Sequence, residues 1–199
     1  LTSSMLEDMQ IEGGSDLQLV TPSLSFQGSD ATGGAFNIRG ITNLAVSPTA
    51  ESGVEIHVND LPVGATTMQD GDFLDMERIE VLRGPQGTLY GKNSVGGVIN
   101  LITAKPQFGQ TFGSMTLEKG SYDLVKTKMM FNMPIGDSLA LRIAGASNDR
   151  DGDIKNIYSK AKTSHVNNRN SGAYRISLAW DATDRTDVLF VHENYSENS

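Results

Sequence analysis

The chain has 199 residues and a formal net charge of −8, from 16 Lys and Arg against 24 Asp and Glu. A chain this acidic offers no basic stripe to neutralise phosphates, which argues against a nucleic-acid partner. It contains no cysteine, so disulfide scaffolds and thiolate zinc sites are excluded. No apolar run approaches the ~20 residues of a membrane helix, so any membrane role must use β-structure.

The first half of the chain predicts short helices followed by short strands. Two capping-box patterns, beginning at Ser4 and Ser15, predict helices over residues 5–9 and 16–20. Loops rich in Gly, Ser, Thr, Asn and Pro then separate four short apolar runs. These runs predict strands over residues 36–39, 54–58, 78–82 and 98–103. Together the elements predict a compact α+β unit over residues 1–106, with its border at the Lys-Pro-Gln segment of residues 105–107.

The second half shows the two-residue period of a sheet with two unlike faces. One segment places Val125, Thr127, Met129, Phe131 and Met133 on one face, opposite Lys126, Lys128, Met130 and Asn132. Five strands are predicted over residues 114–118, 125–133, 139–144, 174–181 and 188–193, the last with poor alternation. Short connections at 134–138 and 183–186 lie at the opposite end from a long polar one at 148–171. Transmembrane barrels show the same asymmetry of short and long loops, although the short connection at 119–123 fits it less well.

The most specific stretch is residues 76–106, MERIEVLRGPQGTLYGKNSVGGVINLITAKP. It predicts a strand, a Gly/Pro-rich breaker cluster, and a second apolar run that ends before Pro106. Its blocks IEVLRGP, LYG, GGVIN and T-x-K-P, in this order, resemble the plug domain of TonB-dependent outer-membrane receptors. The resemblance implies an α+β plug domain over residues 1–106, with an incomplete N-terminus. Residues 107–199 would be the first five strands of an antiparallel transmembrane β-barrel that is incomplete here.

The resemblance also implies a function, namely active uptake of a scarce ligand, most readily an iron–siderophore or similar chelate. The setting would be the outer membrane of a Gram-negative bacterium, with the plug facing the barrel lumen and the periplasm. The partners would be the TonB–ExbB–ExbD energy-transducing complex, the small-molecule ligand and outer-membrane lipid. No cofactor, no resident metal and no enzyme activity are expected. The TonB box would lie outside these residues.

Two arginines are candidates for holding the plug in place. Arg39 and Arg83 each directly precede a glycine at the end of an apolar strand, in NIRG and VLRG. From residue type alone, a solvated surface arginine is the default. In the family that the sequence resembles, two such plug arginines pair with glutamates on the inner barrel wall, which here would lie beyond Ser199. Bidentate pairing of a guanidinium fixes orientation as well as charge, which suits a plug–barrel lock.

Two polar loops, residues 41–53 and 64–72, are candidate apices of the plug that contact the ligand, and ordinary solvated loops are the equal alternative. The candidate contact residues are Thr42, Asn43, Ser47, Glu51, Thr66, Thr67 and Gln69. Acidic residues near these loops disfavour an anionic ligand: Glu51, Asp70 and Asp72. Structural turns are expected where glycine allows positive φ or close backbone approach, or where proline breaks a strand. These positions are Gly40, Gly84, Pro85, Gly87, Gly91, Gly96 and Gly97.

Two other classes of function stay open. If the strands over residues 125–180 belonged to a soluble sandwich, the chain would be a structural or adhesive β-protein without transport. The segment GTLYGKN at 87–93 invites a nucleotide-binding enzyme, but Gln86 and Asn93 stand where a P-loop needs Gly and Ser or Thr. The segment DRDGD at 149–153 lacks the later Gly and Glu of an EF-hand loop. The three histidines share no ligand spacing, and no catalytic set is recognisable.

Overall fold

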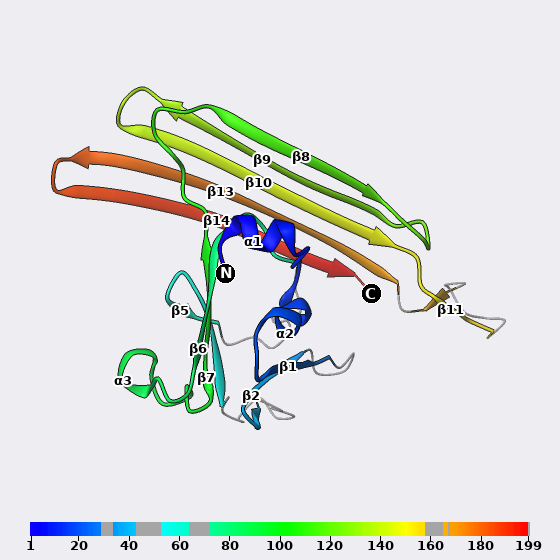
Figure 1. The fold of residues 1–199 in the computed structure, drawn as a ribbon. Helices are drawn as coiled ribbons and strands as arrows, with labels where there is room; N and C mark the ends of the chain where they lie inside the picture. Colours follow the sequence, from blue (N-terminus) through cyan, green and yellow to red (C-terminus); the bar gives the residue numbers. More distant parts are fainter. Residues whose placement is uncertain (29–33, 43–52, 64–71, 158–164, 167, 199) are drawn as a thin grey trace. The chain divides into compact units, whose positions relative to one another are not determined.

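The computed structural model describes residues 1–28, 34–42, 53–63, 72–157, 165–166 and 168–198 (Figure 1). The chain divides into two compact units, Leu1–Ala104 and Lys105–Ser199, called unit 1 and unit 2 below. Unit 1 mixes short helices with two small sheets, and unit 2 is built on one antiparallel sheet. The predicted fold class, an α+β unit followed by antiparallel strands, is therefore confirmed.

The helices of unit 1 begin with caps other than those predicted. The first three are α1 Ser3–Asp8, the 3-10 turn η1 Gly14–Asp16 and α2 Leu17–Val20. The cap of α1 is Thr2 and not Ser4, because the Thr2 side chain accepts the N–H of Met5. Before α2, the carboxylate of Asp16 accepts two main-chain N–H groups, of Glu12 and Gly13, at 2.9 and 3.1 Å. Helix α1 thus starts with a side-chain cap, whereas the Asp16 carboxylate fixes the turn that precedes α2, and α2 itself starts without a side-chain cap bond.

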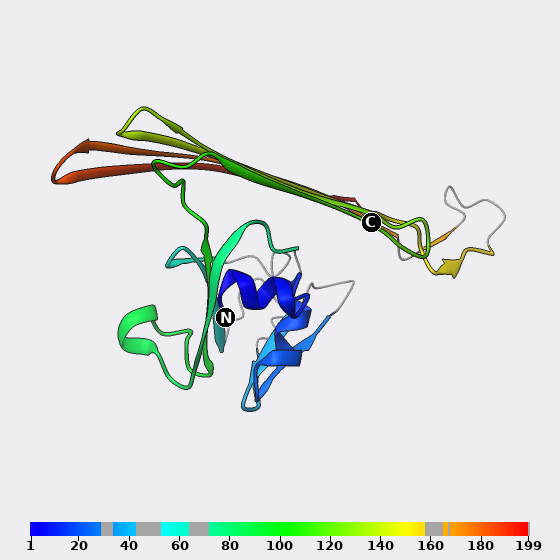
Figure 2. The ribbon, with the colours of Figure 1, turned by 45° about the horizontal axis from the view of Figure 1, so that its top comes forward.

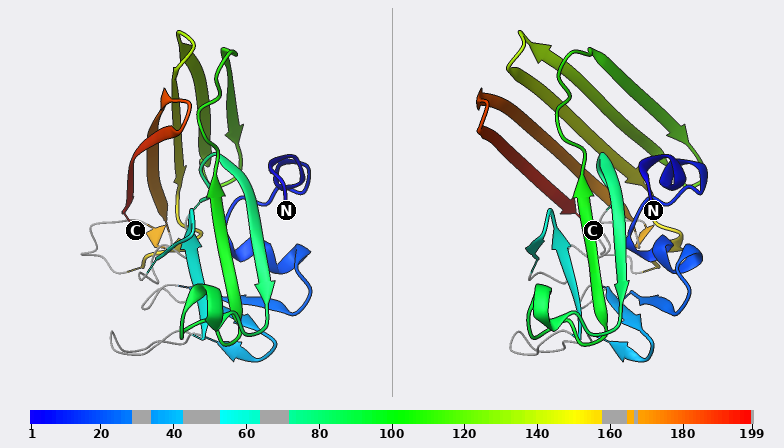
Figure 3. Two further views of the ribbon diagram at one scale, coloured as in Figure 1. Left: turned by 90° about the vertical axis from the view of Figure 1, so that its left-hand side faces the viewer. Right: turned by 60° about the vertical axis from the view of Figure 1, so that its left-hand side comes forward.

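Two sheets complete unit 1. A three-stranded sheet holds β1 Leu24–Gln27, β2 Ala35–Ile38 and β3 Ile41–Thr42. A four-stranded sheet in the order β5-β4-β7-β6 holds β4 Val54–Val58, β5 Leu61–Pro62, β6 Met76–Arg83 and β7 Gly97–Thr103. Strand β4 pairs with β7 in parallel and the other pairings are antiparallel (Figure 3). A fourth helix, α3 Gly87–Tyr90, lies between β6 and β7 in the chain.

The core of unit 1 draws on the helices and on both sheets. Its buried apolar side chains are Leu6, Ile11, Leu17, Leu24, Phe36, Ile38, Val54, Ile56, Ile79 and Ile99. Burying an aliphatic side chain fully stabilises a fold by about 1.5–3 kcal/mol, so this cluster stabilises the unit. Phe26 packs beside it against Phe36, with ring centroids 5.0 Å apart.

A two-residue turn joins β4 to β5 and is fastened to β7. Asn59 and Asp60 both have positive φ, 51° and 67°, which is the geometry of a type I′ hairpin. The Asn59 Oδ1 accepts the main-chain N–H of Thr103 at 3.0 Å, and Asn100 Nδ2 donates to Asp60 Oδ1 at 2.7 Å. Asn100 is fully buried. The turn therefore uses polar side chains of the central strand as its anchor.

Unit 2 is a five-stranded sheet in the order β14-β13-β10-β9-β8, and Figure 2 shows it as a single layer seen nearly edge-on. The strands are β8 Phe112–Lys119, β9 Val125–Ile135, β10 Leu139–Arg150, β13 Arg169–Thr183 and β14 Thr186–Asn198. The long connection between β10 and β13 carries a two-stranded hairpin, β11 Ile154–Lys155 and β12 His165–Val166. Strand pairing continues well past the alternating segments, so every strand of the sheet is longer than predicted.

One buried side chain ties the start of unit 2 to its sheet. Asn132 of β9 is fully buried. Its Oδ1 accepts the main-chain N–H of Gln107 at 2.8 Å, and its Nδ2 donates to the carbonyls of Gln107 and Gln110 at 2.9 and 2.8 Å. The segment before β8 is thereby fixed against the polar side of β9.

The base of the β6–β7 hairpin generates a prediction about two glycines. A Cβ at Gly97 would lie 2.3 Å from the carbonyl oxygen of Leu82, with φ at +151°, whereas Gly87 has open space at the same place. We expect Gly97→Ala to lower the free energy of unfolding by about 1–3 kcal/mol. Gly87→Ala, at the first residue of α3, should be neutral or stabilising by up to ~1 kcal/mol. Urea unfolding of residues 1–106, followed by circular dichroism, measures both, and equal effects would contradict this account.

Candidate membrane face and plug lock

The two faces of the unit 2 sheet are reversed relative to a soluble protein. Alternate residues along the strands form one apolar face, and its large side chains are exposed. They are Met115, Leu117, Val125, Met129, Phe131, Met133, Ile135, Ile143, Tyr174, Ile176, Trp180, Val188 and Phe190. Isolated apolar residues at a surface need no explanation, but a contiguous apolar face marks contact with a membrane or another protein.

The opposite face of the sheet is mostly polar, apart from exposed Leu189 and Val191 on β14, and much of it is buried. Its buried side chains are Lys126, Asn132, Arg142, Asn148, Ser171, Arg175 and Ser177. Arg175 is 2% exposed, and its Nε and Nη2 donate to the two carboxylate oxygens of Glu193 at 3.1 and 2.9 Å. The Arg142 guanidinium lies 5.6 Å from the centre of the Phe112 ring. Charges removed from water need such partners, so this face is built to hold polar groups.

The strand lengths and the aromatic residues fit the thickness of a bilayer. Strands β9 and β10 have 11 and 12 residues, and a tilted strand crosses a bilayer with about 9–11 residues. Tyr174 and Trp180 stand on the apolar face of β13, six residues apart, which separates them by about 20 Å along the strand. Aromatic girdles flank the apolar band of transmembrane barrels at about this scale. No helix in the described part of the chain is both long and apolar enough to span a membrane.

The structure brings the two candidate lock arginines to one turn of unit 1. Arg39 has φ +54° in the tight turn between β2 and β3, and its main-chain N–H donates to the Ser23 carbonyl at 3.1 Å. The Nη1 of Arg83 donates to the Pro22 carbonyl at 3.3 Å. Both arginines are exposed. Arg83 and Pro22 thus meet although they are 61 residues apart in the chain. The NIRG and VLRG patterns alone could not show this contact.

The candidate apices are mostly beyond what the structure describes. Asn43, Ser47, Glu51, Thr66, Thr67 and Gln69 lie outside the described residues. Thr42 is described: it is half-buried at the end of β3, and its Oγ1 donates to the Phe36 carbonyl at 3.5 Å. This contact anchors the point where the first apex loop begins.

The expected turn positions divide by their geometry. Positive φ occurs at Gly40, Gly84, Gly91 and Gly97. A Cβ at Gly96 would lie 3.1 Å from the carbonyl of Gly53, so a side chain here would crowd the neighbouring strand. Pro85 is exposed in the turn that follows β6. Gly87 differs from the expectation, because it begins α3 without positive φ and with open space around its Cα.

Residues 84–96 form a hairpin tip that carries α3. Main-chain bonds run from Gly84 N–H to the Gly96 carbonyl and from Gln86 N–H to the Ser94 carbonyl, both at 2.9 Å. Lys92 follows the end of α3, whereas the lysine of a P-loop stands at the start of its helix. The described residues also contain no group of three or more His, Cys, Asp or Glu side chains suited to a metal ion. The tip is therefore a structural hairpin, and the nucleotide-binding alternative gains no support.

Sequence reasoning missed the polar side chains that tie elements together. Asn132 fastens the segment before β8, and the Arg175–Glu193 pair joins β13 to β14. A signal for the second was present, because a cross-strand Arg and Glu fall on the same polar face once the register is known. The sequence did not give the register of β13 against β14, because β14 alternates poorly.

Comparisons with known proteins agree with this geometry. Residues 1–98 match the family model of the TonB-dependent receptor plug domain. The iron-regulated outer membrane virulence protein of Vibrio cholerae is 40% identical over 84 residues, which are 39% of this chain and 13% of that protein. The pesticin receptor of Yersinia pestis is 30% identical over 136 residues, 67% of this chain and 20% of that protein. The chain thus spans a fifth or less of the length of these relatives.

A solved structure shares the fold of both units. The crystal structure of the ferric yersiniabactin uptake receptor of Yersinia pestis superposes with a TM-score of 0.84, over 98% of this chain and 30% of that chain, at 24% identity. Its match extends beyond the plug into the antiparallel strands. With a matching plug model, related receptors and a shared fold, the chain belongs to the family of TonB-dependent receptors.

Proposed function

We propose that the protein takes up an iron chelate across the outer membrane, with energy supplied through the TonB–ExbB–ExbD complex. The observation that carries the proposal is the order of the two units: a plug domain followed in the chain by a sheet whose apolar face is exposed and whose polar face is largely buried. A membrane-spanning strand needs an apolar side for lipid, and a plugged lumen needs a polar side. One named relative is an iron-regulated outer membrane protein and the solved structure is a ferric yersiniabactin uptake receptor, which points to the class of ligand.

The proposed arrangement gives each unit a part in transport. The apolar face of unit 2 contacts outer-membrane lipid, and its polar face lines the lumen. Unit 1 closes the lumen toward the periplasm until TonB pulls on it. The chelate binds by non-covalent contacts, so the protein needs no cofactor and catalyses no reaction. A soluble adhesive sandwich fits the exposed apolar face less well, because in a sandwich a second sheet covers that face.

Iron uptake tests the proposal directly. Cells that carry the complete gene, a deletion, or the gene in a TonB-deficient background would be given radioactive ferric complexes of a catecholate, a hydroxamate and a phenolate chelator. We expect accumulation of at least one complex to need both the gene and TonB, and to stop when a protonophore collapses the proton gradient. Uptake of every complex at the same rate in the deletion strain would overturn the proposal.

The assignment of faces yields a matched pair of substitutions on β9. Phe131 stands on the apolar face and Met130 on the polar face, where its strand neighbours are Ser114 and Ala144. We expect Phe131→Arg to destabilise the receptor in lipid vesicles by about 2–4 kcal/mol, because an arginine near the bilayer centre is costly. Met130→Arg should cost much less. Folding into vesicles across a urea series measures the difference, and equal costs on both faces would contradict the assignment.

Arg39 and Arg83 are proposed to lock the plug against glutamates of barrel strands beyond residue 199. Their convergence at the Pro22–Ser23 turn supports a shared role. Changing both to Glu would set like charges against those glutamates, and a partly buried like-charge contact costs more than a lost surface pair. We expect a large dye to leak faster through the outer membrane at equal receptor abundance.

Two controls keep the lock prediction specific. Leakage should fall back when the wall glutamates are changed to Arg in the double-Glu background. Glu77→Lys, a charge change at an exposed position of β6, should leave leakage at the wild-type rate. If the double variant stays as tight as wild type and transports normally, the two arginines are ordinary surface residues.

A further inference from the structure

A histidine and a glutamate lie side by side on β4, in a part of unit 1 that the proposed transport does not use. His57 Nε2 is 3.4 Å from Glu55 Oε2, and the two side chains are 4% and 16% exposed. They stand two residues apart on one strand, so they share a face of the sheet. Within the described part of the chain, neither atom makes a hydrogen bond of normal geometry, and both are shielded from solvent.

The other ring nitrogen of His57 restricts where protons can be. His57 Nδ1 lies 3.1 Å from the main-chain carbonyl oxygen of Asp60. A carbonyl oxygen only accepts, so Nδ1 must carry a hydrogen. A neutral imidazole has a single N–H, so Nε2 of a neutral His57 would turn its lone pair toward a carboxylate oxygen. Two acceptors that face each other away from water are unfavourable, and one added proton removes the conflict.

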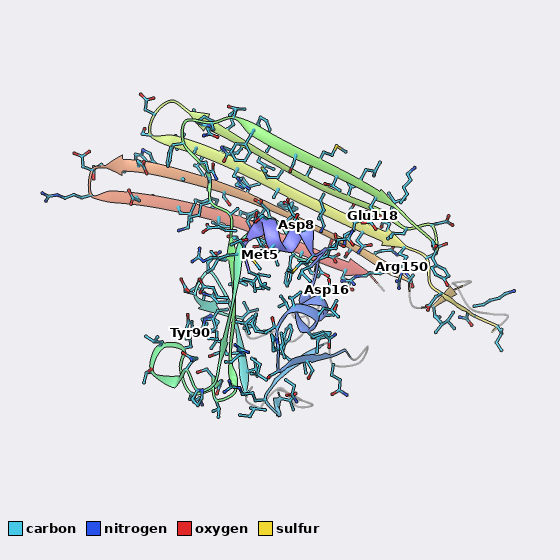
Figure 4. The ribbon with its side chains drawn as sticks, in the orientation of Figure 1. Met5, Asp8, Asp16, Tyr90, Glu118 and Arg150 are labelled. Carbon is cyan, nitrogen blue, oxygen red and sulfur yellow. The ribbon has the colours of Figure 1, made fainter. Side chains whose placement is uncertain are left out.

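We propose that His57 and Glu55 hold one proton between them in the folded plug, with His57 as the imidazolium, and that this pair seats α3 on β4. The Tyr90 ring, at the end of α3 (Figure 4), stands nearly perpendicular to the His57 ring, at 81° with centroids 4.9 Å apart. An edge-to-face contact of this kind depends on the position of both rings. Loss of the proton leaves two acceptors opposed beneath Tyr90, and the hairpin tip loosens.

The charged surroundings of His57 make Glu55 the decisive neighbour. Asp60 lies in the β4–β5 turn, and its carboxylate already accepts a hydrogen bond from Asn100 Nδ2 at 2.7 Å. Tyr90 of α3 contacts the His57 ring. The strand neighbours of His57 are Pro62 of β5 and Asn100 of β7, neither of which carries a charge.

The protonation of His57 is measurable in the complete receptor. Histidines labelled with nitrogen-15 would be observed by NMR in detergent micelles, and the His57 signals assigned from their loss in His57→Gln. At pH 7 we expect both ring nitrogens of His57 to carry hydrogen. In Glu55→Gln the side-chain amide can donate to Nε2, so His57 should become the neutral Nδ1–H form.

A matched control and the contrary outcomes complete this measurement. Glu80→Gln changes a more exposed glutamate of β6, which pairs with Arg78, and should leave the His57 signals unchanged. A neutral His57 in the wild type at pH 7 would overturn the proposal. So would signals that do not respond to Glu55→Gln.

The seating of α3 is tested by hydrogen exchange at the amides of residues 89–94, expressed relative to the intrinsic exchange rate at each pH. When the pH rises past the loss of the imidazolium signal, exchange in the wild type should increase about tenfold, as expected for losing a charge-assisted contact. Glu55→Gln should abolish this dependence on pH, because its amide satisfies neutral His57. A wild type without the increase, or the same increase in Glu55→Gln, would overturn the proposal.

Discussion

A β-strand sends successive side chains to opposite faces, and in unit 2 this alternation separates what can meet lipid from what cannot. A one-residue slip of a strand would carry Arg142 or Arg175 to the apolar face and an isoleucine to the polar one. The register is therefore under strong constraint, and cross-strand contacts on the polar face add to it. The two bonds from Arg175 to Glu193 fix β13 against β14, and they form in one register only. Stability of the sheet and its compatibility with a membrane thus depend on the same pairing.

Unit 1 has the opposite arrangement. Its apolar side chains meet in a core, and the polar side chains around that core need hydrogen-bond partners. Asn100 sits fully buried in the central strand, where an apolar residue would be the simpler choice. Its amide instead binds Asp60, and Asn59 binds Thr103, three residues further along β7. A buried amide with satisfied bonds specifies one arrangement of a turn, because leaving it unsatisfied costs about 1–3 kcal/mol.

Local patterns predicted the parts of this fold that local physics determines. The strands of β9 and β10 followed from alternation, and β6 and β7 from apolar runs bounded by Gly and Pro. The two-residue strands β3 and β5 were missed, since a pair of residues becomes a strand only through a partner supplied by the tertiary fold. The caps of α1 and α2 were misplaced by two residues and by one residue, because several neighbouring Ser, Thr and Asp side chains could serve equally well in the sequence.

The candidate sites also divide into features that local sequence predicts and features that only the tertiary fold supplies. Glycine and proline positions near residue 84 were recognisable, since backbone geometry is written into those residue types. The meeting of Arg39 and Arg83 at the Pro22–Ser23 turn was not, because it joins three segments that are distant in the chain. Glu55 and His57 share a face by simple alternation, yet their significance depends on the Asp60 carbonyl, which a turn of left-handed residues brings to the ring.

The β6–β7 hairpin connects the two proposals made for unit 1. Its base is closely packed, since Gly97 has the Leu82 carbonyl and the Ile38 side chain within 3 Å of where a Cβ would lie. Arg83 stands at this base, while Tyr90 stands in the tip. Among the described contacts, the tip is held by a few main-chain bonds and by the Tyr90–His57 pair. Segments with few packed contacts open at lower free energy than a packed core. A force on the plug would therefore move the tip before the base, and the proton on His57 would set how readily that first movement occurs.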